Sequence, residues 1–229
     1  MDAVLHASDT AGTVAISAIA GAGGIGKTSL ALHWAHRVRS RFPDGQLFVN
    51  LRGHSAGAPL SAGQALDELL HSLGVERANR PTSVDAAAAA YRSALADRRM
   101  LVVLDDAAEV DQVRPLLPGT AGCMVVITSR DRFDGLVARE GARQVLLDVL
   151  ATEDALAVVG AVVGDARVAD DETNARELVR LCGNSPLALR IAAAHLSTRP
   201  DQPVGDYVTA LRTGDRLAVL EPLSTDMTP

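Results

Sequence analysis

The chain has 229 residues, of which 48% are hydrophobic, and it carries a formal net charge of −6. This length can bury the core of one large domain or of two small ones. The negative charge argues against a segment that grips nucleic-acid phosphates by charge. Three Phe, two Tyr and one Trp also offer little surface for stacking on single-stranded nucleic acid.

Several features favour a cytoplasmic protein without membrane contact. No basic stretch leads an apolar segment at the N-terminus, so no secretory signal peptide is expected. The longest uncharged run outside the glycine loop, from Ala155, is too short to cross a bilayer. Cys123 and Cys182 match no metal spacing and are expected to be reduced core thiols. His33 and His36 are spaced to share a metal, but an ordinary helix surface explains them better.

Strands and helices alternate over the first 150 residues. Five apolar, partly β-branched segments predict buried strands: 13–20, 46–51, 100–106, 123–130 and 143–150. Helices are expected from Thr28 onward and over 61–73 and 83–97. The first of these places Leu30, Trp34 and Val38 on one face, which predicts a packing role for Trp34.

Beyond residue 150 the pattern predicts helices only, over 152–163, 171–182, 186–197 and 204–211. Thr152 is expected to cap the first of them, with two acidic residues following it in the first turn. This arrangement predicts an α/β fold with a parallel sheet, followed by a small all-helical domain. The expected domains cover 1–150 and 151–220, with a tail at 221–229.

Lys27 is the only lysine of the chain, beside 21 arginines. It lies in "GAGGIGKT", Gly21–Thr28, which spells G-x-x-x-x-G-K-T between a predicted strand and a predicted helix. In that context the glycines let backbone N–H groups surround a phosphate, and the helix N-terminus adds positive potential. Lys27 is expected to reach the β- and γ-phosphates, because a compact ammonium fits where a guanidinium is too broad. The Thr28 hydroxyl is expected to bind Mg²⁺.

A second polar site follows the strand "MLVVLDD". Its apolar residues bring Asp105 to the strand end, where a carboxylate can hold the hydration shell of Mg²⁺. Asp106 takes the position at which many ATPases with this kind of phosphate loop have a Glu that polarises the attacking water. Since Asp is one methylene shorter, slow turnover is expected. The alternative is a pair of solvated acids at the start of a turn.

A third polar site ends the strand "CMVVITSR". Thr128, Ser129 and Arg130 follow an apolar run, and ligands of open α/β sheets bind at the carboxyl ends of strands. Arg130 is therefore a candidate sensor of the γ-phosphate, with an exposed arginine at a strand end as the alternative. No D-x-x-G follows the phosphate loop and no LSGGQ-like signature is present, which argues against a GTPase and a transporter ATPase.

Five segments in this order resemble the NB-ARC module of STAND ATPases: "GAGGIGKTSLALHWAH", "FPDGQLFVNLRGH", "VVLDDA…QVRPLLPG", "VVITSR" and "LCGNSPLALRIAAAHL". Within that group the chain looks most like the AfsR-like Streptomyces antibiotic regulatory proteins (SARP). The resemblance covers about residues 13–220. It implies a P-loop NTPase sheet with strand order 2-3-4-1-5, followed by an ARC1-like helical domain.

The resemblance also implies a site for ATP or ADP with Mg²⁺. The loop residues that would contact the nucleotide are Gly23, Gly24, Ile25, Gly26, Lys27, Thr28 and Ser29. Mg²⁺ would be bound by Thr28 and Asp105, with Asp106 in the hydrolytic role and Arg130 in the sensing role. Pro186, in "GNSPL", would lie against the adenine, although a residue-level interpretation makes it only a helix start.

The implied function is a slow ATPase that acts as a switch in a transcriptional regulator of secondary metabolism. Implied partners are DNA-binding, winged-helix and tetratricopeptide-like domains that flank the module, and copies of the chain in the ATP state. The family's upstream Gly-Arg segment and winged-helix His are both missing, which predicts a core fragment or an unusually small protein. The alternatives are a stand-alone P-loop kinase or phosphotransferase, and an interaction module that binds nucleotide without turnover.

Overall fold

The computed structural model describes Met1, residues 14–55 and residues 57–214. These form two compact units. One contains the sheet and comprises Met1–Gly23 and Lys27–Leu147, and the other comprises the chain from Asp148 onward together with Gly24–Gly26 of the glycine loop. The tail expected at 221–229 lies outside the described residues.

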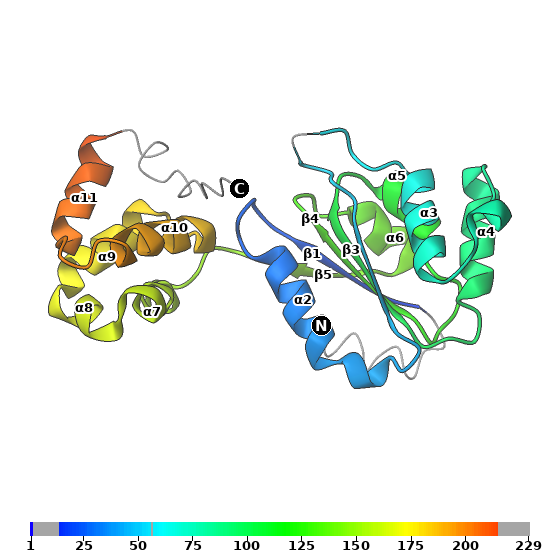
Figure 1. The fold of residues 1–229 in the computed structure, drawn as a ribbon, viewed down its shortest axis with the longest axis horizontal. Coiled ribbons are helices and arrows are strands. Elements are labelled where there is room, and N and C mark those ends of the chain that lie inside the picture. The colour runs from blue at the N-terminus through cyan, green and yellow to red at the C-terminus, as the bar shows by residue number, and fades with distance from the viewer. Residues whose placement is uncertain (2–13, 56, 215–229) are drawn as a thin grey trace, which may run out of the picture. The chain divides into compact units, whose positions relative to one another are not determined.

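The first unit is built on a five-stranded parallel sheet in the order β2-β3-β4-β1-β5 (Figure 1). The strands are β1 Ala15–Ala20, β2 Gln46–Asn50, β3 Leu101–Ala107, β4 Met124–Ser129 and β5 Arg143–Leu146. This confirms the α/β class and the predicted order 2-3-4-1-5. Since all five strands run the same way, their carboxyl ends lie along one edge of the sheet.

Helices cover both faces of this sheet (Figure 1). They are α2 Lys27–Arg37, α3 Ala62–Ser72, α4 Val84–Ala94, α5 Val110–Val113 and α6 Asp134–Glu140. Successive residues of a strand point to opposite faces, so Leu101 and Val103 pack with the α2 residue Trp34, which is 3% exposed. Val102 and Leu104 pack in the other core, with α3 and α4.

Single-turn 3-10 helices and capped helix starts complete the connections. The 3-10 helices cover Arg39–Arg41, Arg77–Asn79 and Arg114–Leu116. The Ser61 side chain caps α3 by accepting from Gln64 N, while the Gln64 side chain accepts from Ser61 N. Reciprocal bonds of this kind satisfy two otherwise unpaired N–H groups.

The first unit differs from the sequence expectation in its short elements. β5 ends at Leu146 and not at residue 150, because its only neighbour, β1, ends at Ala20. The backbone of β1 turns there into the glycine loop and offers no further ladder. Helices α5 and α6 were not predicted, because four and seven residues are too few to show a periodic apolar face.

The second unit is all-helical among its described residues and has a core of its own. Its helices are α7 Thr152–Val163, α8 Asp165–Asp170, α9 Glu172–Leu181, α10 Pro186–Ser197 and α11 Val204–Thr213. Helix α7 packs on α9 and α10, and α9 packs on α11. The predicted helices are present, and α8 was not predicted.

The expectation that Thr152 caps α7 is wrong. The N-cap is Ala151, which has no side-chain capping bond, and Thr152 is the first helical residue. The carbonyl of Ala151 already accepts from Ala155 N at 2.9 Å, so Thr152 lies inside the helix, which begins at the expected residue, and does not cap it. Glu153 and Asp154 do lie in the first turn, where negative charge is favourable.

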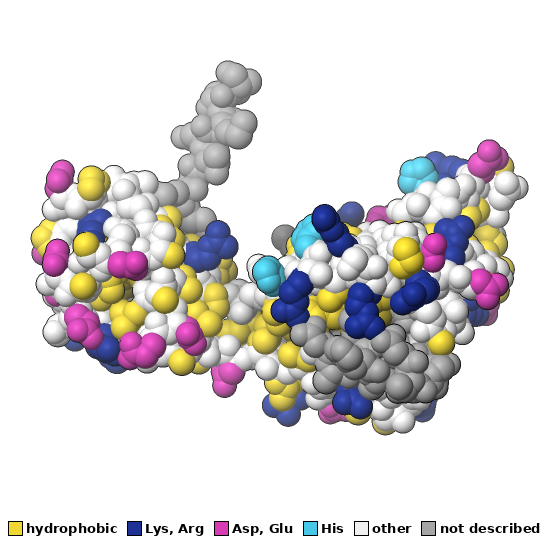
Figure 2. Space-filling model, turned by 90° about the horizontal axis from the view of Figure 1, so that it is seen from below, with side chains coloured by type: hydrophobic (Ala, Val, Ile, Leu, Met, Phe, Trp, Pro, Cys, Tyr) yellow, Lys and Arg dark blue, Asp and Glu magenta, His cyan; other side chains and the backbone are white. Residues whose placement is uncertain are grey.

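No helix in the described part of the chain is long and apolar enough to cross a membrane. Both cysteines are buried, as expected. Basic side chains and histidines gather on the face of the first unit seen in Figure 2. Helix α2 and the turn after it contribute His33, His36, Arg37 and Arg39 to the exposed surface. Among the described residues, no three His, Cys, Asp or Glu side chains cluster in a way that could hold a metal.

Candidate nucleotide-binding site

The glycine loop joins β1 to α2, the position that the sequence predicts. Gly24 and Gly26 have φ angles of 73° and 96°, which lie in the left-handed region that glycine adopts most readily. Helix α2 begins directly at Lys27. The first N–H groups of a helix have no partner within it, so the loop and the helix start together provide donors for an anion.

The Lys27 ammonium lies over this loop. Its Nζ donates to the carbonyls of Gly21 and Ala22, both at 2.8 Å. Partial burial lowers the pKa of Lys27, and the positive charge of Arg130 lowers it further, while Asp106 and Asp105 oppose this shift. An anion bound beside Lys27 and Arg130 would relieve the repulsion between the two cations.

Asp105 lies at the carboxyl end of β3 and is 4% exposed. Its Oδ1 accepts from the Thr28 hydroxyl at 2.7 Å and from the Thr128 hydroxyl at 2.6 Å. Three segments far apart in sequence thus bring oxygen atoms together next to the glycine loop. Mg²⁺ prefers oxygen ligands and keeps several of its waters, so Thr28 and Asp105 fit a Mg²⁺ ion that is otherwise bound by water and phosphate.

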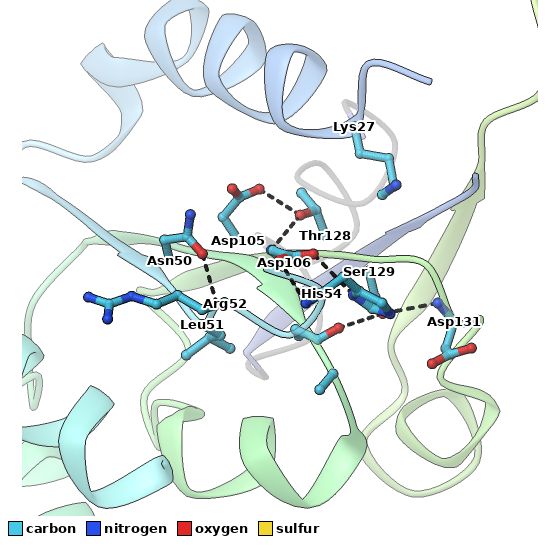
Figure 3. Close-up of polar contacts among 12 residues, drawn as sticks. Lys27, Asn50, Leu51, Arg52, His54, Asp105, Asp106, Thr128, Ser129 and Asp131 are labelled. Atoms are coloured by element: carbon cyan, nitrogen blue, oxygen red, sulfur yellow. Dashed lines mark hydrogen bonds and ion pairs between the residues drawn. The ribbon is translucent and has the colours of Figure 1, made fainter. Parts of the chain in front are cut away.

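Asp106, the next residue, has a φ of 51°, which is uncommon for a residue with a side chain. Its N–H donates to the Thr128 hydroxyl at 2.9 Å. Its carboxylate contacts His54, a residue of the loop after β2 (Figure 3). The left-handed backbone turns successive side chains apart, so Asp105 and Asp106 have different partners.

Arg130 follows β4 directly and is exposed. A Cβ atom placed on Gly23 would lie 3.4 Å from the Arg130 Cζ, so the guanidinium lies beside the glycine loop. The two polar residues before it belong to the sheet edge. Thr128 bonds to Asp105, and the Ser129 hydroxyl donates to Ala107 O at 2.8 Å. The strand therefore leaves Arg130 as the side chain available to a ligand at this edge.

The NB-ARC domain model matches residues 1–169. The chain belongs to the NB-ARC family. This confirms the family that the sequence motifs resemble, and the match extends over the whole glycine loop and the ends of β3 and β4.

This NB-ARC chain is similar in sequence to known regulatory proteins. It is 50% identical over 187 residues to regulatory protein AfsR of Streptomyces coelicolor, a match that covers 81% of this chain and 18% of that protein. The NB-ARC chain thus spans less than a fifth of the length of that relative.

Solved structures confirm the fold. A Walker-type ATPase of Pyrococcus abyssi matches with a TM-score of 0.61 and 12% identity, covering 92% of this chain and 70% of that one. A STAND protein with a tetratricopeptide repeat sensor from Pyrococcus horikoshii matches with a TM-score of 0.51 and 23% identity, covering 83% and 28%. At these identities the likeness establishes a P-loop ATPase fold.

In the NB-ARC chain, Pro186 begins α10 of the second unit. Gly183 and Asn184 before it have φ angles of 59° and 54°. Asn184 holds the start of the unit, because its side chain donates to Leu150 O at 2.8 Å and its carbonyl accepts from Leu150 N at 3.1 Å. The helix-start role of Pro186 is thus present, and contact with adenine stays a prediction.

The residue-level interpretation missed His54. It ends the motif "FPDGQLFVNLRGH", which contributes to the family resemblance but by itself assigns no role to the histidine. His54 and Asp106 are 52 residues apart, and neither residue is part of a pattern that relates the two. A histidine soon after the end of a predicted strand, in a sheet with acids at the same edge, was the available signal.

Proposed function

We propose that this chain is an ADP/ATP-binding switch module that hydrolyses ATP slowly and forms part of a transcriptional regulator of secondary metabolism. The observation that carries the proposal is the meeting of Thr28 and Asp105 at 2.7 Å beside the glycine loop. That contact supports a Mg²⁺ site next to a phosphate site.

The described side chains support distinct roles in such a site. The loop residues Gly23, Gly24, Ile25, Gly26, Lys27, Thr28 and Ser29 would bind the phosphates, with Lys27 at the β- and γ-phosphates. Thr28 and Asp105 would hold Mg²⁺, which would supply positive charge to the phosphate site. Asp106 would hold the attacking water, and Arg130 would distinguish ATP from ADP. We propose Pro186 as the adenine contact, and a helical domain over 151–220 that follows a nucleotide-binding domain over 1–150.

The regulatory part of the proposal rests on the AfsR relative, whose name describes a regulatory protein. A switch needs two states that the ligands bind with different affinity, since equal affinity for both shifts nothing. We propose that flanking domains read this difference, and that the segment itself binds neither DNA nor membrane. A kinase remains the second candidate function, because the same phosphate site would serve a transfer to another acceptor.

The test begins with the nucleotide that denaturation releases from the purified protein, followed by ATP turnover with and without small-molecule acceptors. Hydrolysis without an acceptor supports the switch, acceptor-dependent turnover supports a kinase, and binding without turnover leaves an interaction module. If no nucleotide is released and none binds, the proposal is wrong.

Lys27 permits a more specific measurement, because it is the only lysine of the chain. Acylation of its amine, read by mass spectrometry of the loop peptide, should be slowed at least about tenfold by saturating MgATP. Lys27→Ala should abolish ATP binding or weaken it severely, since charge-assisted bonds contribute about 1.5–3 kcal/mol each. Arg139→Ala removes one exposed positive charge of the same unit and should leave the affinity unchanged.

A further inference from the structure

His54 holds both oxygens of the Asp106 carboxylate. Its backbone N–H donates to Oδ2 at 3.0 Å, and its imidazole Nδ1 lies 3.1 Å from Oδ1 (Figure 3). The two side chains are 23% and 24% exposed. A single residue thus supplies two partners to the side chain that would hold the attacking water.

The backbone of its loop fixes the position of His54. Leu51 N donates to Asp105 O at 2.8 Å, and Gly53 N donates to Asp106 O at 2.6 Å. A Cβ on Gly53 would lie 2.5 Å from Ala108 N and 2.6 Å from Asp106 O, so this loop contacts the end of β3 without room for a side chain. The imidazole is therefore presented to Asp106 by main-chain contacts that do not depend on the imidazole itself.

The chemistry of the pair determines the position of one hydrogen. An ionised carboxylate only accepts hydrogen bonds, so Nδ1 of His54 must carry the proton that is shared with Oδ1. Each carboxylate oxygen has two acceptor positions, and His54 takes one on each. One acceptor position per oxygen is left for water, and the plane of the carboxylate can no longer rotate freely.

We propose that His54 is the positioning residue that orients Asp106 for ATP hydrolysis, an inference that rests on the proposed function. Asp106 is one methylene shorter than the Glu that many such ATPases have, so the orientation of its carboxylate decides where a water is held. A displacement of about 1 Å in a reacting group costs on the order of a hundredfold in rate. The His54–Asp106 pair removes the rotation that would produce such a displacement.

Three substitutions at His54 test this role by steady-state ATP turnover and by titration of ADP and a non-hydrolysable ATP analogue. His54→Ala keeps the backbone bond and loses the imidazole, and we expect kcat to fall about tenfold or more with both nucleotide affinities within about twofold of wild type. His54→Phe keeps a ring without a donor and should lose as much. His54→Asn places an amide donor near the position of Nδ1 and should recover most of the turnover.

Two controls separate positioning from a general structural role. His33→Ala removes an exposed histidine from α2 and should leave kcat and affinity unchanged. In an Asp106→Asn background, His54→Ala should lower kcat no further, because the carboxylate that it orients is gone. Equal kcat in wild type and His54→Ala overturns the proposal. A rise in kcat also overturns it, since His54 would then restrain Asp106.

A nitrogen-15 NMR measurement of the imidazole tautomer reads the pair without any turnover. We expect the Nδ1–H form of His54 in the wild type. In Asp106→Asn, the downfield resonance of the Nδ1–H proton should disappear or change its chemical shift clearly. An Nε2–H form with a bare Nδ1 overturns the positioning role even if ATP is hydrolysed. If the wild type binds nucleotide without hydrolysis, both the hydrolytic function and the positioning role of His54 are wrong. Turnover that is insensitive to His54 overturns only the positioning role.

Discussion

Arg130 shows at the scale of one residue how a strand end selects a side chain for a ligand. Thr128 and Ser129 are buried and bonded within the sheet, whereas Arg130 is exposed beside Gly23. Its charge also contributes to the lowered pKa of Lys27. The two cations therefore share one region, where we expect a terminal phosphate to bind.

We expect Arg130→Ala to weaken the affinity for a non-hydrolysable ATP analogue by about tenfold to a hundredfold and to leave the affinity for ADP nearly unchanged. The reason is that ADP lacks the γ-phosphate, and one charge-assisted contact contributes about 1.5–3 kcal/mol. Calorimetric titration of both nucleotides measures the difference, with Arg139→Ala as the control for lost positive charge. An equal loss for both nucleotides would assign Arg130 to the fold or to the shared phosphates.

At the scale of elements, the loop after the edge strand β2 contacts Asp105 and Asp106 at the carboxyl end of β3. β3 pairs with β2 on one side and β4 on the other. Leu51 and Gly53 bond to the backbone of Asp105 and Asp106, and Thr128 of β4 contacts both acids. The acids are thus held between two neighbouring strand ends, and Thr28 at the start of α2 also contacts Asp105.

Gly53→Ala is expected to destabilise the first unit by about 1–3 kcal/mol, because the new methyl group would overlap backbone atoms that cannot move aside. Trp34 is the only tryptophan and lies in the core of this unit, so its fluorescence in urea measures the effect there. Gly57→Ala is the matched control. A Cβ on Gly57 meets nothing within 4 Å, and the change should stay within about 0.5 kcal/mol. Equal midpoints for the two variants would contradict a tightly packed loop.

At the scale of the whole molecule, the two units have separate cores, and each core contains one of the two tyrosines. Tyr91 lies in the larger core of the first unit, and Tyr207 in that of the second. Burial is the main cause that raises the pKa of Tyr207 to about 12, and it raises the pKa of Tyr91 as well. The Tyr207 hydroxyl lies 3.0 Å from His195 Nδ1.

These shifts predict that tyrosinate absorbance stays absent from the folded protein at about pH 10.5 and appears on unfolding in urea, where phenols ionise near pH 10. A folded pKa above the unfolded value means that the folded state retains protons longer. Stability from this source is therefore complete below about pH 10 and falls as the pH rises, between pH 10 and about 12 for Tyr207. Half-formed tyrosinate at pH 10 with unchanged Trp34 fluorescence would show that at least one phenol is solvated.

The sequence by itself determined the features that depend on contiguous residues. Apolar runs ending in glycines or acids predicted the strands, and G-x-x-x-x-G-K-T located the phosphate loop. The ordered motifs identified the family, and with it the strand order. Short elements such as α5, α6 and α8 escaped, because fewer than about eight residues show no clear period. Strand β5 ended early, because its length depends on where its neighbour β1 turns away.

The family resemblance implied that Thr28 and Asp105 lie near each other, but only the tertiary structure decided the direct contacts and revealed the partner of Asp106. Asp105 contacts Thr28 at a separation of 77 residues, and Asp106 contacts His54 at a separation of 52. Parallel strands bring their carboxyl ends to one edge whatever their spacing in the chain, so no local pattern records these pairs. The left-handed backbone of Asp106 then directs two adjacent carboxylates to different partners. Asp105 and Asp106 are adjacent residues of the same type, yet their environments differ, because the sheet and the loop after β2 place different donors around each carboxylate.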